Sequence, residues 1–180
     1  MKENALDDPC EQHSDIPQFI GERAEISLRN LGKITTGNTP SKKNKEYWTA
    51  KDIPFIKPND IEEAAVTFLE KGTEYVSESA SGKARLVGDG AVLVTCIGTI
   101  AKIAVVKCRR IAFNQQINAV EVDKDVVDPI YLAYALKANS SRLKALANAP
   151  VVPIINKKQF ESFAMLVHVD LDVQRYIASR

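Results

Sequence analysis

The amino-acid sequence predicts a single α+β domain, built on a twisted, mostly antiparallel sheet with helices clustered late in the chain. Its 180 residues match the usual size of one domain, about 100 to 200 residues. The composition, 45% hydrophobic and 26% charged, is that of an ordinary globular protein rather than a disordered or fibrous one. Short β-branched runs dominate up to residue 122, and apolar residues recur at helical spacing from residue 128.

The first strands flank a long polar loop. Residues 26–37, ISLRNLGKITTG, alternate loosely up to a glycine and indicate one strand. Residues 38–48, NTPSKKNKEYW, gather turn-forming residues and lysines and therefore predict a loop. Residues 53–57, IPFIK, are typical of a short apolar strand. Residues 77–85 have a composition compatible with a helix, with Ser77 as its N-cap.

The middle of the chain predicts a pair of buried strands. A glycine-rich turn at 88–90 precedes the apolar run 91–96, and a Gly-Thr pair at 98–99 leads into the run 102–106. Because both runs are almost entirely apolar, we expect two buried strands that are closely joined. Residues 117–122 alternate and predict one more strand.

The last third predicts short helices and strands. Asp128 and Pro129 suit the N-cap and first position of a helix. The β-branched run 151–155 indicates a strand, and Asn156 is the expected cap of a short helix after it. Residues 165–178 add one more strand and a helix capped by an aspartate.

Charge is distributed unevenly along the chain. Residues 1–25 hold seven acidic and two basic residues, a net charge of −5, which leaves +6 for the remainder. Since this segment has no hydrophobic periodicity, we expect a flexible acidic arm over residues 1–25. The basic remainder makes a polyanion such as nucleic acid a candidate partner. Solvated lysines on an ordinary surface explain the same charge.

The cysteines and the N-terminal residues favour a cytoplasmic protein. Cys10, Cys96 and Cys108 are odd in number and lack CxxC spacing, which fits a reducing compartment. The first residues lack the basic and apolar regions of a signal peptide. No apolar run approaches the roughly 20 residues needed to cross a bilayer, so no membrane partner is expected.

The sequence predicts no catalytic residue and no metal site. It contains no dinucleotide fingerprint, P-loop, GxSxG elbow, HExxH motif or CxxC pair. No acidic residue has a lysine two positions later, which removes the acidic-x-Lys cores of many metal-dependent nucleases. His168 lies in a predicted strand, without a nucleophile beside it in sequence, and is interpreted as structural. A small hydrolase is therefore disfavoured.

Four segments, taken in order, resemble one protein family. They are LGKITTGNTPSKKNKEYW with DIPFIKPNDI (31–61), GDGAVLVTCIGTIAKIAVV (88–106), AFNQQINAV (112–120) and DPIYLAYALK (128–137). The set is similar to the target recognition domain of the specificity (S) subunit of type I restriction-modification systems. Two places depart from that family's pattern. Ala101 replaces a usual glycine, and Asp172-Val173-Gln174 replaces part of a Pro-Pro-x-x-Glu-Gln string, which leaves the orientation of the final helix open.

The resemblance implies a target recognition domain over residues 26–169 and the start of a conserved spacer helix at 170–180. It implies a non-catalytic subunit that reads one half of a bipartite site in double-stranded DNA and directs partner subunits there. The methyltransferase (M) subunit would bind S-adenosylmethionine, and the restriction (R) subunit would use ATP and Mg²⁺, so no cofactor is expected in this chain. The length implies either a natural half-subunit, with a second S half-subunit as a further partner, or a fragment.

The loop between Thr36 and Trp48 is the first candidate for DNA contact. Lysines suit phosphates, and amides and hydroxyls suit base edges; an arginine can also bind guanine bidentately. The expected DNA-binding residues are Asn38, Thr39, Ser41, Lys42, Lys43, Asn44, Lys45, Lys57, Asn59, Arg109 and Arg110. Arg109 and Arg110 are interpreted equally well as charged side chains of a loop that contact only solvent.

Neighbouring residues are assigned structural roles. Tyr47 and Trp48 are interpreted as buried anchors of the loop. Gln115 and Gln116 carry amides that could pair with adenine, but they stand between apolar residues and are interpreted as structural. The alternative function is a scaffold or interaction domain of the same fold that does not read DNA.

Overall fold

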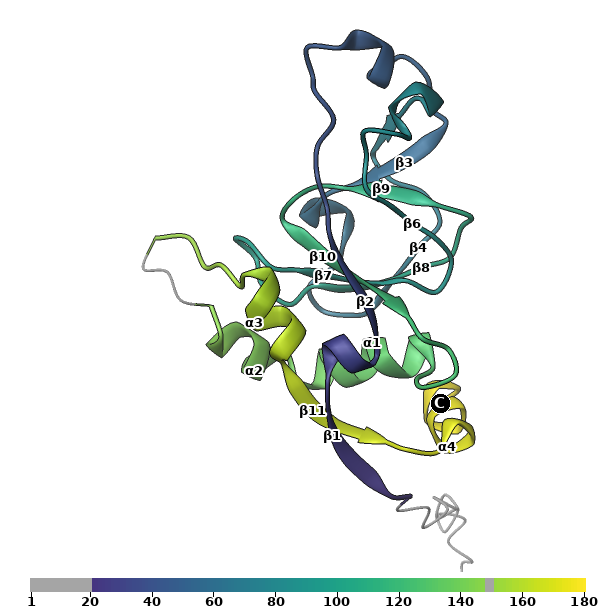
Figure 1. Ribbon diagram of the computed structural model, residues 1–180, viewed down its shortest axis with the longest axis vertical. Helices are drawn as coiled ribbons and strands as arrows, with labels where there is room; N and C mark the ends of the chain where they lie inside the picture. Colours follow the sequence, from purple (N-terminus) through teal and green to yellow (C-terminus); the bar gives the residue numbers. More distant parts are fainter. Residues whose placement is uncertain (1–20, 148–150) are drawn as a thin grey trace, which may run out of the picture.

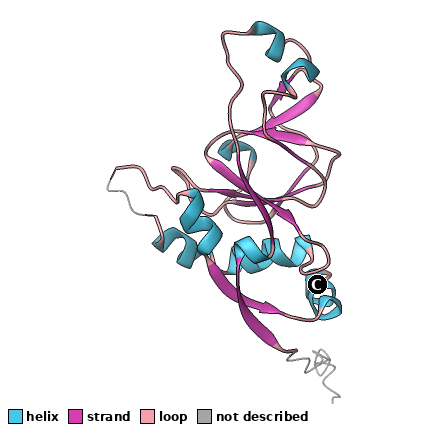
Figure 2. Cartoon of the chain, in the orientation of Figure 1, coloured by secondary structure: helices cyan, strands magenta, loops and turns pink. Residues whose placement is uncertain are grey.

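The computed structural model describes residues 21–147 and 151–180. Within these ranges, the strands form a five-stranded sheet, a four-stranded sheet and a two-stranded ribbon. The four-stranded sheet is stacked on one side of the five-stranded sheet, and the helices lie on the other side, above the ribbon (Figure 1). Strands and helices both contribute to the fold (Figure 2), and all four α-helices of the described ranges follow residue 128, so the predicted α+β class with helices late in the chain is confirmed.

The five-stranded sheet forms the centre of the molecule. Its order is β2 (Gly32–Thr36), β10 (Ile117–Val122), β7 (Val92–Thr95), β8 (Ile103–Val106) and β4 (Thr67–Leu69). All neighbouring pairs are antiparallel except β4 and β8, which are parallel. The predicted pair of closely joined strands is the β7–β8 hairpin.

The four-stranded sheet and the ribbon lie at opposite ends. The sheet has the order β5 (Glu74–Val76), β3 (Ile53–Ile56), β9 (Ile111–Phe113) and β6 (Leu86–Val87). The ribbon pairs β1 (Arg23–Ser27) with β11 (Ala164–His168). The α-helices are α1 (Pro129–Ala138), α2 (Ser140–Ala145), α3 (Lys157–Ser162) and α4 (Leu171–Ala178). Short 3-10 turns are η1 (Leu28–Asn30), η2 (Lys45–Trp48), η3 (Pro58–Asp60) and η4 (Glu78–Ala80).

The central strands are buried on both faces because a core lies on each side of them. Val92 and Val94 of β7 pack with the helices, whereas Leu93 between them packs toward the four-stranded sheet. Such strands carry continuous apolar runs instead of an alternating pattern. A third core, around Phe55 and Val76, covers the far face of the four-stranded sheet.

The predicted strand 26–37 is two strands in different sheets. After β1 the chain makes the turn η1, where Leu28 and Leu31 are fully buried and Leu28 N donates to Phe163 O at 3.0 Å. The free energy gained by burying these two leucines is larger than that lost by interrupting the strand, so the chain turns here. Because β1 begins at Arg23, the folded domain starts before residue 26, and only residues 21–25 of the expected arm are described.

Two further predictions are corrected. The expected helix 77–85 contains only the turn η4, and Ser77 does not cap it, since its Oγ accepts from the backbone N–H groups of Thr49 and Ala50. The expected strand 151–155 is an irregular segment with one isolated bridge, from Ile154 to Ile97.

The predicted helix caps are confirmed. Asp128 Oδ1 accepts from the backbone N–H groups at the start of α1, and Asn156 forms a capping box with Gln159 in α3. Asp170 caps α4. No helix in the described ranges combines the length and apolar character that crossing a membrane requires.

The backbone conformation of Ala101 explains why glycine is usual at this position in the family that the sequence resembles. Its φ is 65°, in the left-handed region that glycine enters without strain. The residue closes the β7–β8 connection by donating its N–H to Thr95 O at 3.0 Å.

Candidate nucleic-acid interface

The predicted loop leaves β2 at a backbone crossing that requires glycine. Gly37 N donates to Ile117 O and Asn38 N donates to Phe113 O, both at 3.0 Å. A Cβ on residue 37 would lie 2.2 Å from Asn114 O, where only a residue without a side chain fits. From this crossing the loop runs along the molecule to its far tip, beyond the four-stranded sheet (Figure 1).

Asn38 and Thr39 hold the loop in place. Asn38 Nδ2 donates to Lys83 O, and Asn38 Oδ1 accepts from Arg85 N, both at 2.7 Å. With both ends of its amide engaged, Asn38 is not free to pair bidentately with a base. Thr39 Oγ1 donates to Gln115 Oε1 at 2.8 Å.

The tip of the loop exposes two amines. Asn44 Oδ1 accepts from Glu46 N at 3.2 Å and so caps η2. Lys43 and Lys45, on either side of Asn44, are exposed, and neither has an ion-pair partner within the described ranges. Ser41 is also exposed. The two amines are therefore available to an external anion.

Lys42 and Lys57 converge instead on Glu74 at the start of β5. Lys42 Nζ lies 3.1 Å from Glu74 Oε2, and Lys57 Nζ pairs with Glu74 Oε1. The Lys57 hydrogen bond is the largest cause of the lowered pKa of the Glu74 carboxyl; Lys42 lowers it further, and partial burial opposes both. Two of the predicted phosphate contacts are thus already paired within the protein.

The aromatic residues anchor the loop, as predicted, but neither is fully buried. Trp48 packs edge-on against Phe55, with ring centroids 5.3 Å apart and an interplanar angle of 85°. Its indole N–H donates to Ser41 O at 3.3 Å, and Lys42 Nζ lies 3.4 Å from the centre of its ring. Tyr47 packs against the same core. Both side chains remain partly exposed.

The remaining candidates lie outside this loop. Arg110 forms a two-pronged ion pair with the Glu78 carboxylate, so its guanidinium is occupied. Arg109 is exposed beside it in sequence. Asn59 is exposed in η3, where Lys102 Nζ donates to Pro58 O at 3.0 Å.

The glutamines differ from each other. Gln116 Oε1 accepts from Asn114 Nδ2 at 2.8 Å, and Gln116 N donates to Asn114 Oδ1, which fits the predicted structural role. Gln115 is exposed and accepts the bond from Thr39. Gln115 therefore lies at the surface beside the loop, and its bond with Thr39 fits the predicted structural hydrogen-bonding role.

Sequence reasoning missed Glu74 as a member of this site. Its strand, β5, has only three residues, too few for a recognisable alternation. The pairing of β5 with β3 places Glu74 opposite Phe55, two residues before Lys57. The one available signal was the excess of lysines in the loop, because a carboxylate elsewhere in the chain can pair with such amines.

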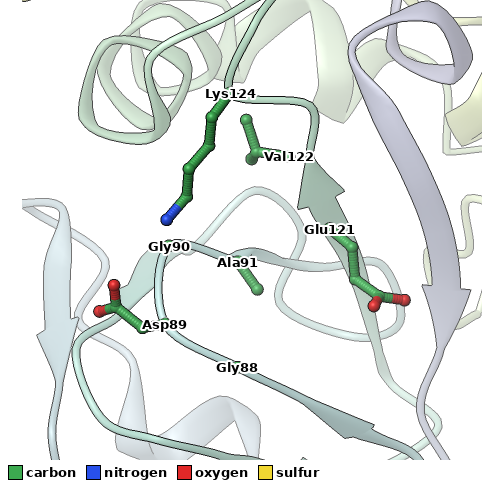
Figure 3. A pocket seen from close by; sticks show the side chains of 7 residues that line it. All are labelled: Gly88, Asp89, Gly90, Ala91, Glu121, Val122 and Lys124. Carbon is green, nitrogen blue, oxygen red and sulfur yellow. The ribbon is translucent and has the colours of Figure 1, made fainter.

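A hollow of about 160 Å³ lies away from the loop, at the turn before β7 (Figure 3). Lys124 points into it toward the turn at Gly88–Gly90, and Asp89 lies at its edge. Among residues 21–147 and 151–180, no three His, Cys, Asp or Glu side chains are grouped to hold a metal ion.

The half-buried His168 and the buried Cys96, both outside the loop, have structural partners. His168 Nδ1 lies 2.8 Å from the Tyr131 hydroxyl, and burial with the charge of Arg23 lowers the pKa of this histidine. Burial raises the pKa of Cys96 to about 12, which keeps it a thiol at neutral pH. Asn118 Nδ2 donates to its sulfur at 3.3 Å.

Comparison with solved structures identifies the fold. An S subunit of a type I restriction-modification system from M. genitalium matches with a TM-score of 0.61 at 12% identity, over 91% of this chain and 39% of that one. The HsdS subunit of Thermoanaerobacter tengcongensis matches with a TM-score of 0.67 at 18% identity, over 94% and 38%. At these identities the likeness shows the fold alone.

Comparison of sequences identifies the family. The chain is 29% identical to the type I restriction enzyme MjaIX specificity subunit of Methanocaldococcus jannaschii, over 79% of its own length and 33% of the relative. It is 27% identical to the HindI specificity subunit of Haemophilus influenzae, over 78% and 30%. It thus spans about a third of these relatives. Residues 22–179 match the type I restriction modification DNA specificity domain, and the chain belongs to that family.

Proposed function

We propose that this chain is a sequence-specific DNA recognition module that reads one half of a bipartite site for a type I restriction-modification enzyme. The observation that carries the proposal is that the amines of Lys43 and Lys45, at the tip of an anchored loop, are exposed and have no ion-pair partner among residues 21–147 and 151–180. Such amines bind phosphates, while the Ser41 hydroxyl in the loop and the amide N–H groups of Gln115 beside it offer hydrogen bonds to base edges.

The chain acts in this proposal without chemistry of its own. Methylation and cleavage belong to M and R subunits, which would bind S-adenosylmethionine, ATP and Mg²⁺. Helix α4 is the start of the spacer that the M subunit holds. Four of the ten large apolar side chains that are exposed in the described part of the chain lie on β11, on α4 or between them, which favours a protein partner there: Leu166, Val169, Tyr176 and Ile177. A DNA-directed enzyme of this kind works in the cytoplasm.

Mapping of adenine methylation tests the proposal. The full-length gene is expressed with its methyltransferase subunit in a host free of adenine methylation, and modified sites are read across the genome. We expect one bipartite motif, and a symmetric motif would indicate a dimer of half-subunits. Replacing Lys43 and Lys45 by glutamine should reduce methylation at that motif. Methylation without any motif would refute sequence reading, and a complex that holds the M subunit but never binds DNA would favour a scaffold.

A further inference from the structure

The loop and β5 enclose a hollow that the DNA-reading surface would include. Its volume is about 340 Å³, and Lys42, Lys51, Trp48 and Tyr75 line it together with Glu74. It lies at the tip of the molecule, where η2 contacts β5. The hollow thus combines two amines and two aromatic rings around one carboxylate.

The charge balance in this hollow favours an anion. Glu74 is the one acidic residue among those that line it, and it is already shared by Lys42 and Lys57. The nearby Asp60 carboxylate is engaged by the backbone N–H groups of Lys57 and Thr73 and by the Thr73 hydroxyl. Lys42 and Lys51 line the hollow, and Lys57 reaches Glu74 from beside it, so three amines share one available carboxylate.

The contacts of Glu74 are those that a phosphate would make. Each carboxylate oxygen accepts one lysine amine, and the side chain is 38% exposed, so an incoming anion can reach the same amines. The Trp48 ring lies 3.4 Å from Lys42 Nζ and holds that amine at the hollow when its partner changes. Exchange of a carboxylate for a phosphate keeps the number of charge-assisted hydrogen bonds.

We propose that this hollow binds one phosphate of the DNA backbone, and that Glu74 competes with that phosphate for Lys42 and Lys57. The inference rests on the proposed DNA-binding function. Glu74 lowers affinity for every DNA sequence alike, because phosphate contacts carry no sequence information. The domain would therefore bind weakly to unrelated DNA, and base contacts would decide where it stays.

The test measures binding of the full 180-residue chain to a fluorescein-labelled duplex of arbitrary sequence by anisotropy. E74Q should bind about threefold to tenfold more tightly than the wild type, the effect expected for releasing two exposed ion pairs. E121Q is the matched control, because Glu121 pairs with the exposed Lys33 at 3.1 Å and the net charge changes equally. It should bind within about twofold of the wild type, since exposed charges beyond about 8 Å are screened at physiological salt.

The same Glu74 substitution in a variant that lacks both lysines tests whether Glu74 acts through Lys42 and Lys57. In K42Q/K57Q the E74Q substitution should no longer raise affinity, and E74A should reproduce E74Q in the wild-type background, with thermal unfolding confirming that each variant is folded. If E74Q and E74A bind no tighter than E121Q, or if the gain persists in K42Q/K57Q, the competition is refuted while DNA binding stands. If neither the wild type nor any variant binds DNA, the proposed function itself fails.

Discussion

At the scale of single residues, the polar side chains of the loop divide into those that hold it and those that can reach a ligand. Asn38 and Asn44 are bonded to backbone groups of the protein, and Lys42 is paired with Glu74. Lys43 and Lys45 have no such partner in the described part of the chain. Composition alone could not separate these roles, because an asparagine that bonds to backbone and one that reads a base look identical in sequence.

Asn38 provides a test of this division. Asn38→Ala removes two hydrogen bonds and leaves Lys83 O and Arg85 N without that partner, so we expect the free energy of unfolding to fall by about 1 to 2 kcal/mol. Lys43→Gln should change it by less than about 0.5 kcal/mol, as exposed sites do. Urea denaturation followed by tryptophan fluorescence measures both. Equal, small effects would mean that Asn38 does not clamp the loop.

At the scale of elements, the final helix is fixed by one buried amide. Gln174 is fully buried on α4; its Oε1 accepts from Asp128 N at 2.7 Å, and its Nε2 donates to His168 O at 2.7 Å. It therefore ties α4 to the start of α1 and to the end of β11. The orientation of this helix, which the altered sequence left open, is set by these bonds.

Gln174→Leu keeps the side-chain volume but removes the side-chain partner of three part-buried backbone groups, Asp128 N, Val126 O and His168 O. We expect it to destabilise the protein by about 2 to 4 kcal/mol, and to detach α4, which faster hydrogen exchange over residues 171–178 would report. Arg175→Ala, on the exposed side of the same helix, should cost less than about 0.5 kcal/mol. Unchanged exchange in Gln174→Leu would show that apolar packing alone holds the helix.

The sequence predicted those helices and strands whose residues near one another in the chain form a recognisable pattern. The caps Asp128 and Asn156 and the apolar run of β7 act through neighbours in the chain, and all three are confirmed. The elements that it missed depend on distant contacts. Strand β9 has three residues and exists because β3 and β6 pair with it on either side. Likewise η1 replaces a strand because Leu28 and Leu31 enter the central core.

At the scale of the whole molecule, the layers place stability and recognition at different ends. The largest core lies between the five-stranded sheet and the helices, and the loop with Lys43 and Lys45 extends from the opposite end (Figure 1). Changes at the tip should therefore alter binding without unfolding the domain. This separation lets the loop vary in sequence while the framework that carries it stays the same.

The near-neutral net charge of the chain does not reveal that its charges are unevenly distributed. The chain carries +1 overall, but residues 1–25 hold −5 of it, and the loop concentrates lysines at one place. Electrostatic attraction to DNA depends on such local density, because charges beyond about 8 Å are screened at physiological salt. Net charge is therefore a poor guide to the partner of this protein.

The salt dependence of DNA binding tests the central claim most directly. Affinity of the full chain for a labelled duplex is measured from low to physiological salt, for the wild type, for K43Q/K45Q and for K157Q/K158Q on α3 as a control of equal charge. We expect log affinity to fall linearly with log salt, with a slope about 2 units shallower in K43Q/K45Q, since each phosphate contact contributes about 0.9. The control should keep the wild-type slope. A wild-type affinity that does not change with salt, or equal slopes for all three proteins, would contradict the assignment of the loop to DNA.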